Sequence, residues 1–373
     1  MPDRLILHVG MHKTGTTAVQ EALAGYDDGD TRVARLRHPN HSIQMLTCFA
    51  QDPTKYHVWV RQGIEPERVL RIRAAMRREL LDELALPRRQ LVISGEEMSL
   101  MHPPSVLEMA DFLAPHARDV SVLAWLRPAV GYIGSALQQM IRAGQATALL
   151  PRPCYRARFA MFAQRYGVGA MTYRLYQEGS STVTDFCDLL GIPPQSVQDR
   201  RDNVSLSDTA LRLIWLLNRT GPVTTGSAAR LAARSATIRH LARRFPGRFA
   251  LPPDLAAAGV DRDDIAWAEA ATGLALSNDI LDIDPATAQR RLEAWLGSVA
   301  EDTEEALDAD LEQLGLRTTR LADLAERVAS LYRHYLDQSE GEAAVKSATV
   351  SIFRAGARDS GAAIKSRLGT STP

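Results

Sequence analysis

Short apolar runs alternate with longer amphipathic segments through the first half of the chain. The apolar runs predict buried strands at residues 5–9, 91–94, 120–126 and 170–173. Apolar residues at helical spacing predict helices between and after them, at residues 17–24, 67–86, 104–114, 130–143, 156–166 and 182–190. Continuous apolar strands that alternate with helices are typical of a central parallel sheet flanked by helices on both faces. The sequence therefore predicts an α/β fold that binds ligands at the carboxyl ends of its strands.

The strand pattern ends at residues 191–194, and the rest of the chain is expected to be mainly helical. We expect one domain over residues 1–300, with an α/β core to about residue 215 and a helical extension after it. Residues 301–373 are expected to form a helical tail with a flexible end, because residues 339–373 are rich in small and polar side chains.

Apolar residues of this tail repeat at alternating spacings of three and four: Leu321, Leu324, Val328, Leu331 and Tyr335. The repeat spans too few heptads to predict a coiled coil. Packing of the tail on the parent domain is therefore expected, with a homodimer formed through the C-terminal helices as the alternative.

The composition is that of an ordinary globular chain without a strong overall charge. Its 373 residues are 45% hydrophobic and 24% charged, and 44 basic residues balance 44 acidic ones. This balance argues against nucleic acid or an anionic membrane as the main partner. No apolar run reaches the ~18 residues of a transmembrane segment, and the first residues lack the pattern of a signal peptide. The three cysteines fit neither a disulfide framework nor a zinc site, so a cytoplasmic protein is expected.

One helical segment is strongly basic. Residues 229–248 contain no acidic residue and carry Arg230, Arg234, Arg239, Arg243, Arg244 and Arg248. A solvated helix face is the simpler interpretation. The alternative is a rim that attracts an anionic acceptor, including peripheral contact with a lipid-linked one.

The segment after the first predicted strand has the glycine spacing of a phosphate-binding loop. It reads Gly10-Met11-His12-Lys13-Thr14-Gly15-Thr16-Thr17. A nucleotide P-loop has two glycines at this separation, followed by a lysine and by a hydroxyl residue that binds magnesium. Thr17 stands at the hydroxyl position, but Thr16 replaces the lysine, and a lysine lies inside the loop at Lys13. Only four lysines occur among the 44 basic residues, so a compact point charge in this loop is unusual for the chain.

The loop keeps what an anion needs and loses what suits a magnesium-bound triphosphate. Gly15 permits a tight turn, and the amides at the start of the following helix favour an anion. The hydroxyls of Thr14, Thr16 and Thr17 are expected to add donors. Lys13 lies at the tip of the loop, where it would meet the bridging oxygen between a 5′-phosphate and a transferred group. A turn rich in glycine and threonine for geometry alone is the alternative.

This loop resembles the 5′-phosphosulfate loop of the sulfotransferases that use 3′-phosphoadenosine 5′-phosphosulfate (PAPS). In the bacterial carbohydrate-type branch of that family, the first strand is followed by a stretch close to His12-Lys13-Thr14-Gly15-Thr16-Thr17. The resemblance covers residues 4–215, and more weakly extends to about residue 275. It implies a P-loop-type three-layer fold and PAPS as the sulfuryl donor. The product would be adenosine 3′,5′-bisphosphate (PAP), and no metal is required.

The resemblance also implies a second anion site, for the ribose 3′-phosphate of PAPS. The family forms this site from an arginine at a strand end and a serine about eight residues later. Here Arg127 closes the third predicted strand, and Ser135 lies in the next predicted helix. An arginine fork with a hydroxyl suits a phosphate monoester. Pro128 follows Arg127 directly where the family often has an aspartate, so the turn departs from the family pattern.

Sulfuryl transfer to a hydroxyl also needs a base, and the second predicted strand ends in Ser94-Gly95-Glu96-Glu97. The resemblance to glycan sulfotransferases implies a glutamate at this strand end as that base. Glu96 fits the spacing and Glu97 is the alternative, because adjacent side chains of an extended segment point to opposite sides. His12 and His102 are further candidates, and a capping role for both glutamates stays open.

The expected function is transfer of the sulfuryl group of PAPS to a hydroxyl of a carbohydrate or glycan-type acceptor. Glu96 would take the hydroxyl proton, while Lys13 and the loop amides would offset charge on the departing phosphate. Arg127 and Ser135 would hold and align the nucleotide. The alternatives are a P-loop small-molecule kinase and a nucleotide-binding scaffold without catalytic activity. Candidates to line the acceptor cleft are His38, His41, Tyr56, His57, Trp59 and the segment after Gly144.

Overall fold

A computed structural model of the chain describes residues 1–198, 206–221, 227–278, 280–316 and 323–341. The chain divides into two compact units. The first comprises Met1–Ala136, Leu150–Val204 and Leu251–Ala288, and the second comprises Leu137–Leu149, Ser205–Ala250 and Gln289–Pro373. Leu321 of the apolar repeat and the end of the tail, residues 342–373, lie outside the described residues.

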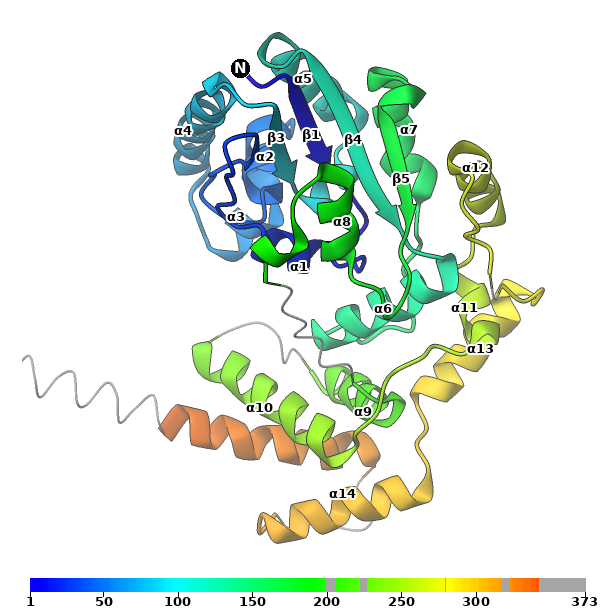
Figure 1. The fold of residues 1–373 in the computed structure, drawn as a ribbon. Coiled ribbons are helices and arrows are strands. Elements are labelled where there is room, and N and C mark those ends of the chain that lie inside the picture. The colour runs from blue at the N-terminus through cyan, green and yellow to red at the C-terminus, as the bar shows by residue number, and fades with distance from the viewer. Residues whose placement is uncertain (199–205, 222–226, 279, 317–322, 342–373) are drawn as a thin grey trace, which may run out of the picture. The chain divides into compact units, whose positions relative to one another are not determined.

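The first unit contains a five-stranded sheet whose strands are all parallel (Figure 1). In chain order the strands are β1 (Arg4–His8), β2 (Thr31–Val33), β3 (Gln90–Ser94), β4 (Asp119–Leu126) and β5 (Met171–Leu175). The predicted α/β fold with a parallel sheet is therefore confirmed. The short edge strand β2 was not predicted, because three residues with an arginine in the middle carry no strand pattern.

Helices flank the sheet on both faces. Those of the first unit are α1 (Thr16–Ala22), α2 (Ser42–Phe49), α3 (His57–Arg61), α4 (Pro66–Ala85), α5 (Pro103–Leu113), α7 (Tyr155–Tyr166), α8 (Thr182–Leu190), α11 (Pro253–Ala256) and α12 (Arg262–Thr272). Two more helices, α6 (Ala129–Arg142) and α13 (Pro285–Leu296), are divided between the units. Helices α2 and α3 lie in the segment that the sequence left without secondary structure.

The residue alternation of β4 and β5 shows which helices cover which face. Trp125 packs with Phe186 of α8 in a core that also contains Ile6 and Val19, so α1 and α8 share this face (Figure 1). Tyr173 points to the opposite face, where its ring lies 5.9 Å from that of Phe159 in α7. Helix α7 also packs against α5 on this second side.

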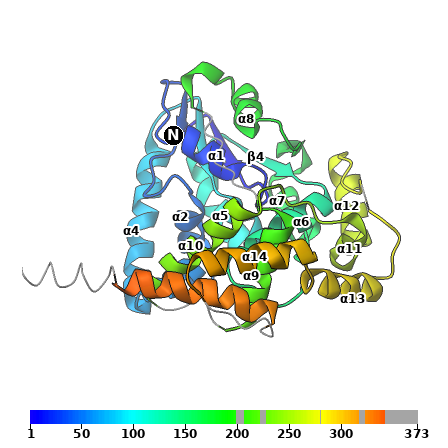
Figure 2. The same ribbon diagram turned by 90° about the horizontal axis from the view of Figure 1, so that it is seen from below.

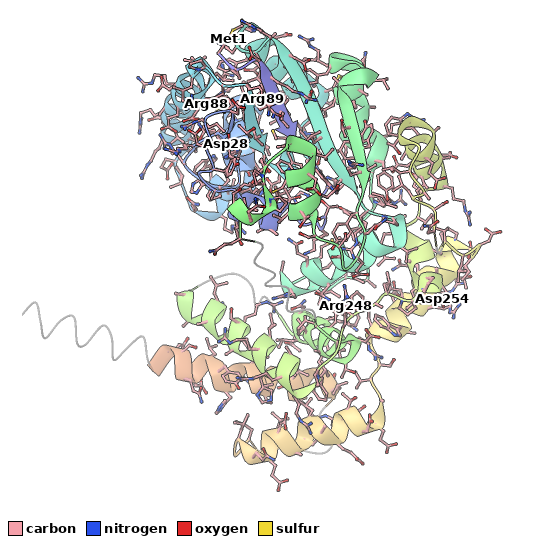
Figure 3. The ribbon with its side chains drawn as sticks, in the orientation of Figure 1. Met1, Asp28, Arg88, Arg89, Arg248 and Asp254 are labelled. Atoms are coloured by element: carbon pink, nitrogen blue, oxygen red, sulfur yellow. The ribbon has the colours of Figure 1, made fainter. Side chains whose placement is uncertain are left out.

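Strand β1 lies in the middle of the sheet, whose order is β2-β3-β1-β4-β5. The chain therefore adds β2 and β3 on one side of β1 and later adds β4 and β5 on the other. Parallel sheets with such a reversal of strand order bind ligands beside it, at the carboxyl ends of the strands. The loops after β1, β3, β4 and β5 all leave from this edge. Met1, Arg88 and Arg89 lie at the opposite edge, where the strands begin (Figure 3).

The second unit is helical, as the sequence predicts for the later part of the chain. It contains α9 (Asp208–Arg219), α10 (Ala228–Arg244), α14 (Glu301–Gln313) and a helix over residues 324–341. Helix α10 lies beside the last two of these (Figure 2), and His240 is 3.0 Å from both Tyr335 and Asp310. None of the described helices is long and apolar enough to cross a bilayer.

The basic segment of α10 is not a uniformly solvated face. Arg234 is buried and donates hydrogen bonds of 2.8 to 3.1 Å to the carbonyls of Ile141 and Arg142, at the end of α6. Arg244 pairs with Asp310 at 3.0 Å. Arg234 therefore joins α10 to the end of α6, and Arg244 joins α10 to α14.

Candidate functional site

The loop after β1 has a strained backbone that α8 holds in place. Lys13 and Gly15 both have positive φ, 69° and 82°. A Cβ at Gly15 would lie 2.7 Å from the hydroxyl oxygen of Thr182, the first residue of α8. The same hydroxyl donates to the carbonyl of Thr14 at 3.0 Å. Glycine is therefore required at position 15 both for its φ and for the close approach of α8.

The threonine hydroxyls of this loop are used in different ways. Thr14 is fully buried and its Oγ1 donates to the carbonyl of Met11 at 2.6 Å, so this hydroxyl shapes the loop. Thr16 Oγ1 is 3.4 Å from the same carbonyl, whereas Thr17 is exposed. Helix α1 begins at Thr16 without a side-chain cap and has seven residues, shorter than the predicted helix. Of the three threonine hydroxyls, those of Thr14 and Thr16 therefore face the loop's own backbone, and that of Thr17 lies on an exposed residue.

Arg127 joins the end of β4 to this loop. Its Nη1 donates to the carbonyl of Lys13 at 3.0 Å, so the structure brings the two predicted anion sites together. A Cβ at Gly131 would be 3.2 Å from Arg127 Nε, which places the guanidinium against the first turn of α6. Ser135 lies one turn after Gly131, on the same face of α6. The hydroxyl of Tyr155, the first residue of α7, donates to the Arg127 carbonyl at 2.6 Å. This bond fixes the backbone between β4 and α6.

A pocket of about 440 Å³ opens beside Arg127. It is formed by the end of β5, the start of α8 and the segment near Leu274. Tyr176 lines it, and the centre of the Arg127 guanidinium lies 5.0 Å from the Tyr176 ring. The pocket therefore has an aromatic wall, the Tyr176 ring, that also contacts Arg127.

Glu96 is held in a polar niche at the end of β3. It is 9% exposed and accepts hydrogen bonds from Gln20 Nε2 at 2.9 Å and Asn40 Nδ2 at 3.3 Å. Gly95 lets the start of α2 approach the end of β3 closely, because a Cβ at this position would lie 2.5 Å from the amide nitrogen of Ser42. Gln20 belongs to α1, the helix that follows the loop after β1 (residues 10–17, the phosphate-type loop). This helix therefore also orients Glu96.

Glu97 has different neighbours. It accepts a 2.6 Å hydrogen bond from the Tyr56 hydroxyl and lies 3.2 Å from His57 Nε2. Burial raises the pKa of Tyr56, and the hydrogen bond to Glu97 adds to this shift. The prediction of an extended segment at the two glutamates is wrong, because residues 96–100 form a 3₁₀ helix, η2 (Glu96–Leu100). The two carboxylates nevertheless contact separate sets of residues.

The histidines of the region divide into buried and accessible ones. His8 is fully buried, its Nδ1 is 2.9 Å from Ser94 Oγ, and burial lowers its pKa to about 3. His41 is also buried, and its Nδ1 accepts the amide of Ser94 at 3.0 Å. Both rings are therefore neutral parts of the core. His41, which we expected to line the acceptor cleft, is buried in the structure. Trp59 is buried as well, whereas His38, His57 and His102 are exposed.

His12 lies half-buried in the loop, among the charged groups of the site. Burial is the main cause that lowers the pKa of His12; the carboxylate of Glu96 opposes this shift and the charge of Arg158 adds to it. The charge of Glu96 therefore acts on the His12 ring, as expected if both residues belong to one site.

Arg158 is a residue of this site that the sequence interpretation missed. It is 6% exposed, and its Nη1 donates to Ser99 Oγ at 3.0 Å. The sequence contains an indication of this role: Arg158 lies on the apolar stripe of α7, three residues after Tyr155 and four before Phe162. An arginine on a buried stripe needs a specific reason to be there.

The carboxyl edge of the sheet thus brings together a strained loop with a lysine, a buried carboxylate and two arginines. No three histidine, cysteine, aspartate or glutamate residues lie close enough to hold a metal ion in the described part of the chain. No family model matches the chain, and neither does any curated protein sequence.

Proposed function

We propose that the protein is a PAPS-dependent sulfotransferase that transfers a sulfuryl group to a hydroxyl of a carbohydrate acceptor. One observation carries the proposal: the 3.0 Å hydrogen bond from Arg127 to the carbonyl of Lys13, which joins two separate anion-binding segments. A donor with phosphates at both the 5′ and 3′ positions of its ribose needs two such segments side by side. A nucleoside triphosphate carries no 3′-phosphate for the second one.

The fold supports this assignment. A loop between the central strand and the next helix, at the reversal point of a parallel sheet, is the position expected of a phosphate-binding loop. We therefore propose a fold of the P-loop type. The pocket lined by Tyr176 would receive the nucleoside, since the Arg127 guanidinium lies over the Tyr176 ring.

The proposed reaction is an in-line transfer. The acceptor hydroxyl oxygen forms a bond to sulfur, the bond from sulfur to the 5′-phosphate oxygen breaks, and PAP leaves with the electron pair. Glu96 accepts the hydroxyl proton, and Gln20 and Asn40 hold its carboxylate in position. Lys13 and the loop amides stabilise the charge that develops on the departing phosphate. Arg127 and Ser135 align the donor.

The acceptor is expected near η2, because its hydroxyl must reach Glu96. Glu97, which follows Glu96 in the sequence, forms hydrogen bonds with Tyr56 and His57, and His57 is exposed. Such polar groups with an aromatic ring suit the hydroxyls and the ring faces of a sugar. We therefore propose a glycan or glycoside acceptor.

Calorimetric titration of the purified chain tests this function. PAP should bind without magnesium, and ATP with magnesium should not compete. Arg127→Gln and Lys13→Ala separate the two roles: the first should weaken PAP binding, and the second should reduce sulfuryl transfer from labelled PAPS far more than PAP affinity. Binding of magnesium-ATP in preference to PAP would contradict the proposal and favour a kinase.

A further inference from the structure

Arg158 stands apart from the other buried arginines of the described residues. Four arginines there are less than 10% exposed: Arg32, Arg158, Arg234 and Arg327. Arg32 pairs with Glu83 and Asp27, and Arg327 pairs with Glu304 and Asp308. Arg234 binds the carbonyls at the end of a helix, where the helix dipole is negative.

The acceptors of Arg158 are all uncharged. They are the Ser99 hydroxyl at 3.0 Å, the Tyr132 hydroxyl at 3.0 Å and the Pro153 carbonyl at 2.7 Å. These bonds use three of the five N–H groups of a guanidinium. Within the described part of the chain, no carboxylate accepts from Arg158. A buried positive charge without a negative partner is costly, so it points to a partner that arrives with a ligand.

The position of Arg158 indicates where that ligand lies. Ser99, which accepts from Arg158, has its hydroxyl 2.7 Å from the carbonyl of Glu96 and 3.4 Å from the carbonyl of Gly10. Arg158 is thus linked to the first residue of the loop and to the proposed base. Its charge also reaches His12, inside the loop.

We propose that Arg158 binds the sulfuryl group of the donor, between the phosphate-type loop and Glu96, with Ser99 and Tyr132 orienting its guanidinium. This assignment rests on the proposed function. The sulfuryl group of PAPS places negative charge beyond the 5′-phosphate, at a position where PAP has no atoms. A cation at this place therefore distinguishes donor from product, which Arg127 and Ser135 do not.

The test compares PAPS with PAP in the absence of an acceptor. Arg158→Gln should weaken PAPS binding about tenfold or more, since charge-assisted hydrogen bonds are lost, and should leave PAP binding within about threefold. Arg158→Lys should recover most of the PAPS affinity, because it restores the charge. A purely structural role predicts that both variants behave alike, since lysine cannot make the three hydrogen bonds. Equal losses for PAPS and PAP, or no loss, would overturn the assignment.

Arg165→Gln is the matched control. Arg165 lies on the same helix, is more exposed and pairs with Asp111 at 2.8 Å, so its loss should change neither affinity. If Arg158→Gln does not fold, Ser99→Ala replaces it. That variant keeps the charge but removes the acceptor of Nη1, and it should reduce PAPS affinity more than PAP affinity; an equal effect on both would count against the assignment.

The two proposals can fail separately. If wild-type protein binds PAP but Arg158→Gln discriminates PAPS from PAP as wild type does, only the role of Arg158 is wrong. If wild-type protein binds neither nucleotide, the proposed function fails, and thermal unfolding with inorganic sulfate or pyrophosphate then tests Arg158 alone. Stabilisation of wild type that Arg158→Gln lacks would support an anion site at Arg158. Equal stabilisation of both proteins, or of neither, would refute it.

Discussion

The side-chain amide of Gln20 donates a 2.9 Å hydrogen bond to Oε2 of Glu96. This bond joins the helix that starts at the phosphate-type loop to the end of β3. Gln20 is 4% exposed, so the bond is shielded from water and fixes the direction of the carboxylate. In the proposed enzyme, the group that binds the donor and the group that deprotonates the acceptor are therefore parts of one connected assembly.

Gln20→Ala should separate catalysis from nucleotide binding. Among the described residues, loss of this donor leaves the side-chain amide of Asn40 to hold the Glu96 carboxylate, which is then able to turn. We expect about a tenfold or greater fall in the rate of sulfuryl transfer, with PAP affinity nearly unchanged. Gln44→Ala is the control, because Gln44 is an equally buried amide that donates to the carbonyl of Met76 instead. A similar rate loss in both variants would mean that general destabilisation causes the effect.

Glu96→Gln and Glu97→Gln identify the base. Glu96→Gln should lower turnover about 10²-fold or more, because an amide cannot accept the proton. Glu97→Gln should lower it less and instead raise the KM for the acceptor, because it disturbs the contacts with Tyr56 and His57. Steady-state kinetics with saturating PAPS measure both. The reverse ranking would transfer the role of base to Glu97.

Gly15→Ala should combine a backbone penalty with a clash. A left-handed conformation costs an L-residue about 1 to 2 kcal/mol, and the new Cβ would also lie 2.7 Å from the Thr182 hydroxyl oxygen. Gly25→Ala is a matched control, since Gly25 has a φ of 75° and nothing within 4 Å of its Cβ position. Urea unfolding should show the larger loss of stability for Gly15→Ala, and only this variant should lose PAP binding. Equal losses would mean that α8 yields to the methyl group.

Tyr155→Phe tests the support beneath Arg127. The Arg127 carbonyl would lose a 2.6 Å hydrogen bond, at a cost of about 1 to 3 kcal/mol in the free energy of unfolding. PAP affinity should fall with it, because the turn that carries Arg127 loosens. Tyr166→Phe removes another buried tyrosine hydroxyl, one without a hydrogen-bond partner among the described residues, and should cost no stability. If both variants bind PAP like wild type, Tyr155 does not position Arg127.

The sequence predicted the elements that have a strong periodic pattern. Buried strands such as β1 and β4 are continuous apolar runs, and α8 begins and ends at the predicted residues. The loop and the adjacency of Lys13 and Arg127 followed from the rule that parallel strands end at one edge. Strand β2 and helix α3 are too short to show a period, and were missed.

Contacts between distant polar side chains could not be predicted in the same way. No periodicity relates Gln20 to Glu96 or Arg158 to Ser99, because each pair depends on how two separate elements pack. The 3₁₀ turn at Glu96 likewise follows a close contact between two elements: Ser42, the first residue of α2, approaches Gly95 at the end of β3. The sequence could thus predict which polar residues lie in the loop and at the strand ends, but it could not show what orients them.

The buried histidines predict how stability depends on pH. Burial lowers the pKa of His41 to about 4 and that of His8 to about 3, from an ordinary value of 6.5. The unfolded chain therefore binds more protons than the folded one below pH 6.5, so the free energy of unfolding should fall as the pH drops from 6.5 toward 4. Each histidine contributes a slope of up to about 1.4 kcal/mol per pH unit.

His41→Asn keeps an acceptor for the Ser94 amide but does not titrate. It should therefore reduce the slope by the contribution of one proton, up to about 1.4 kcal/mol per pH unit. Urea unfolding measured at a series of pH values gives the slope, with the exposed His38→Asn as the control. An unchanged slope in His41→Asn would mean that His41 becomes protonated without leaving its place beside Ser94.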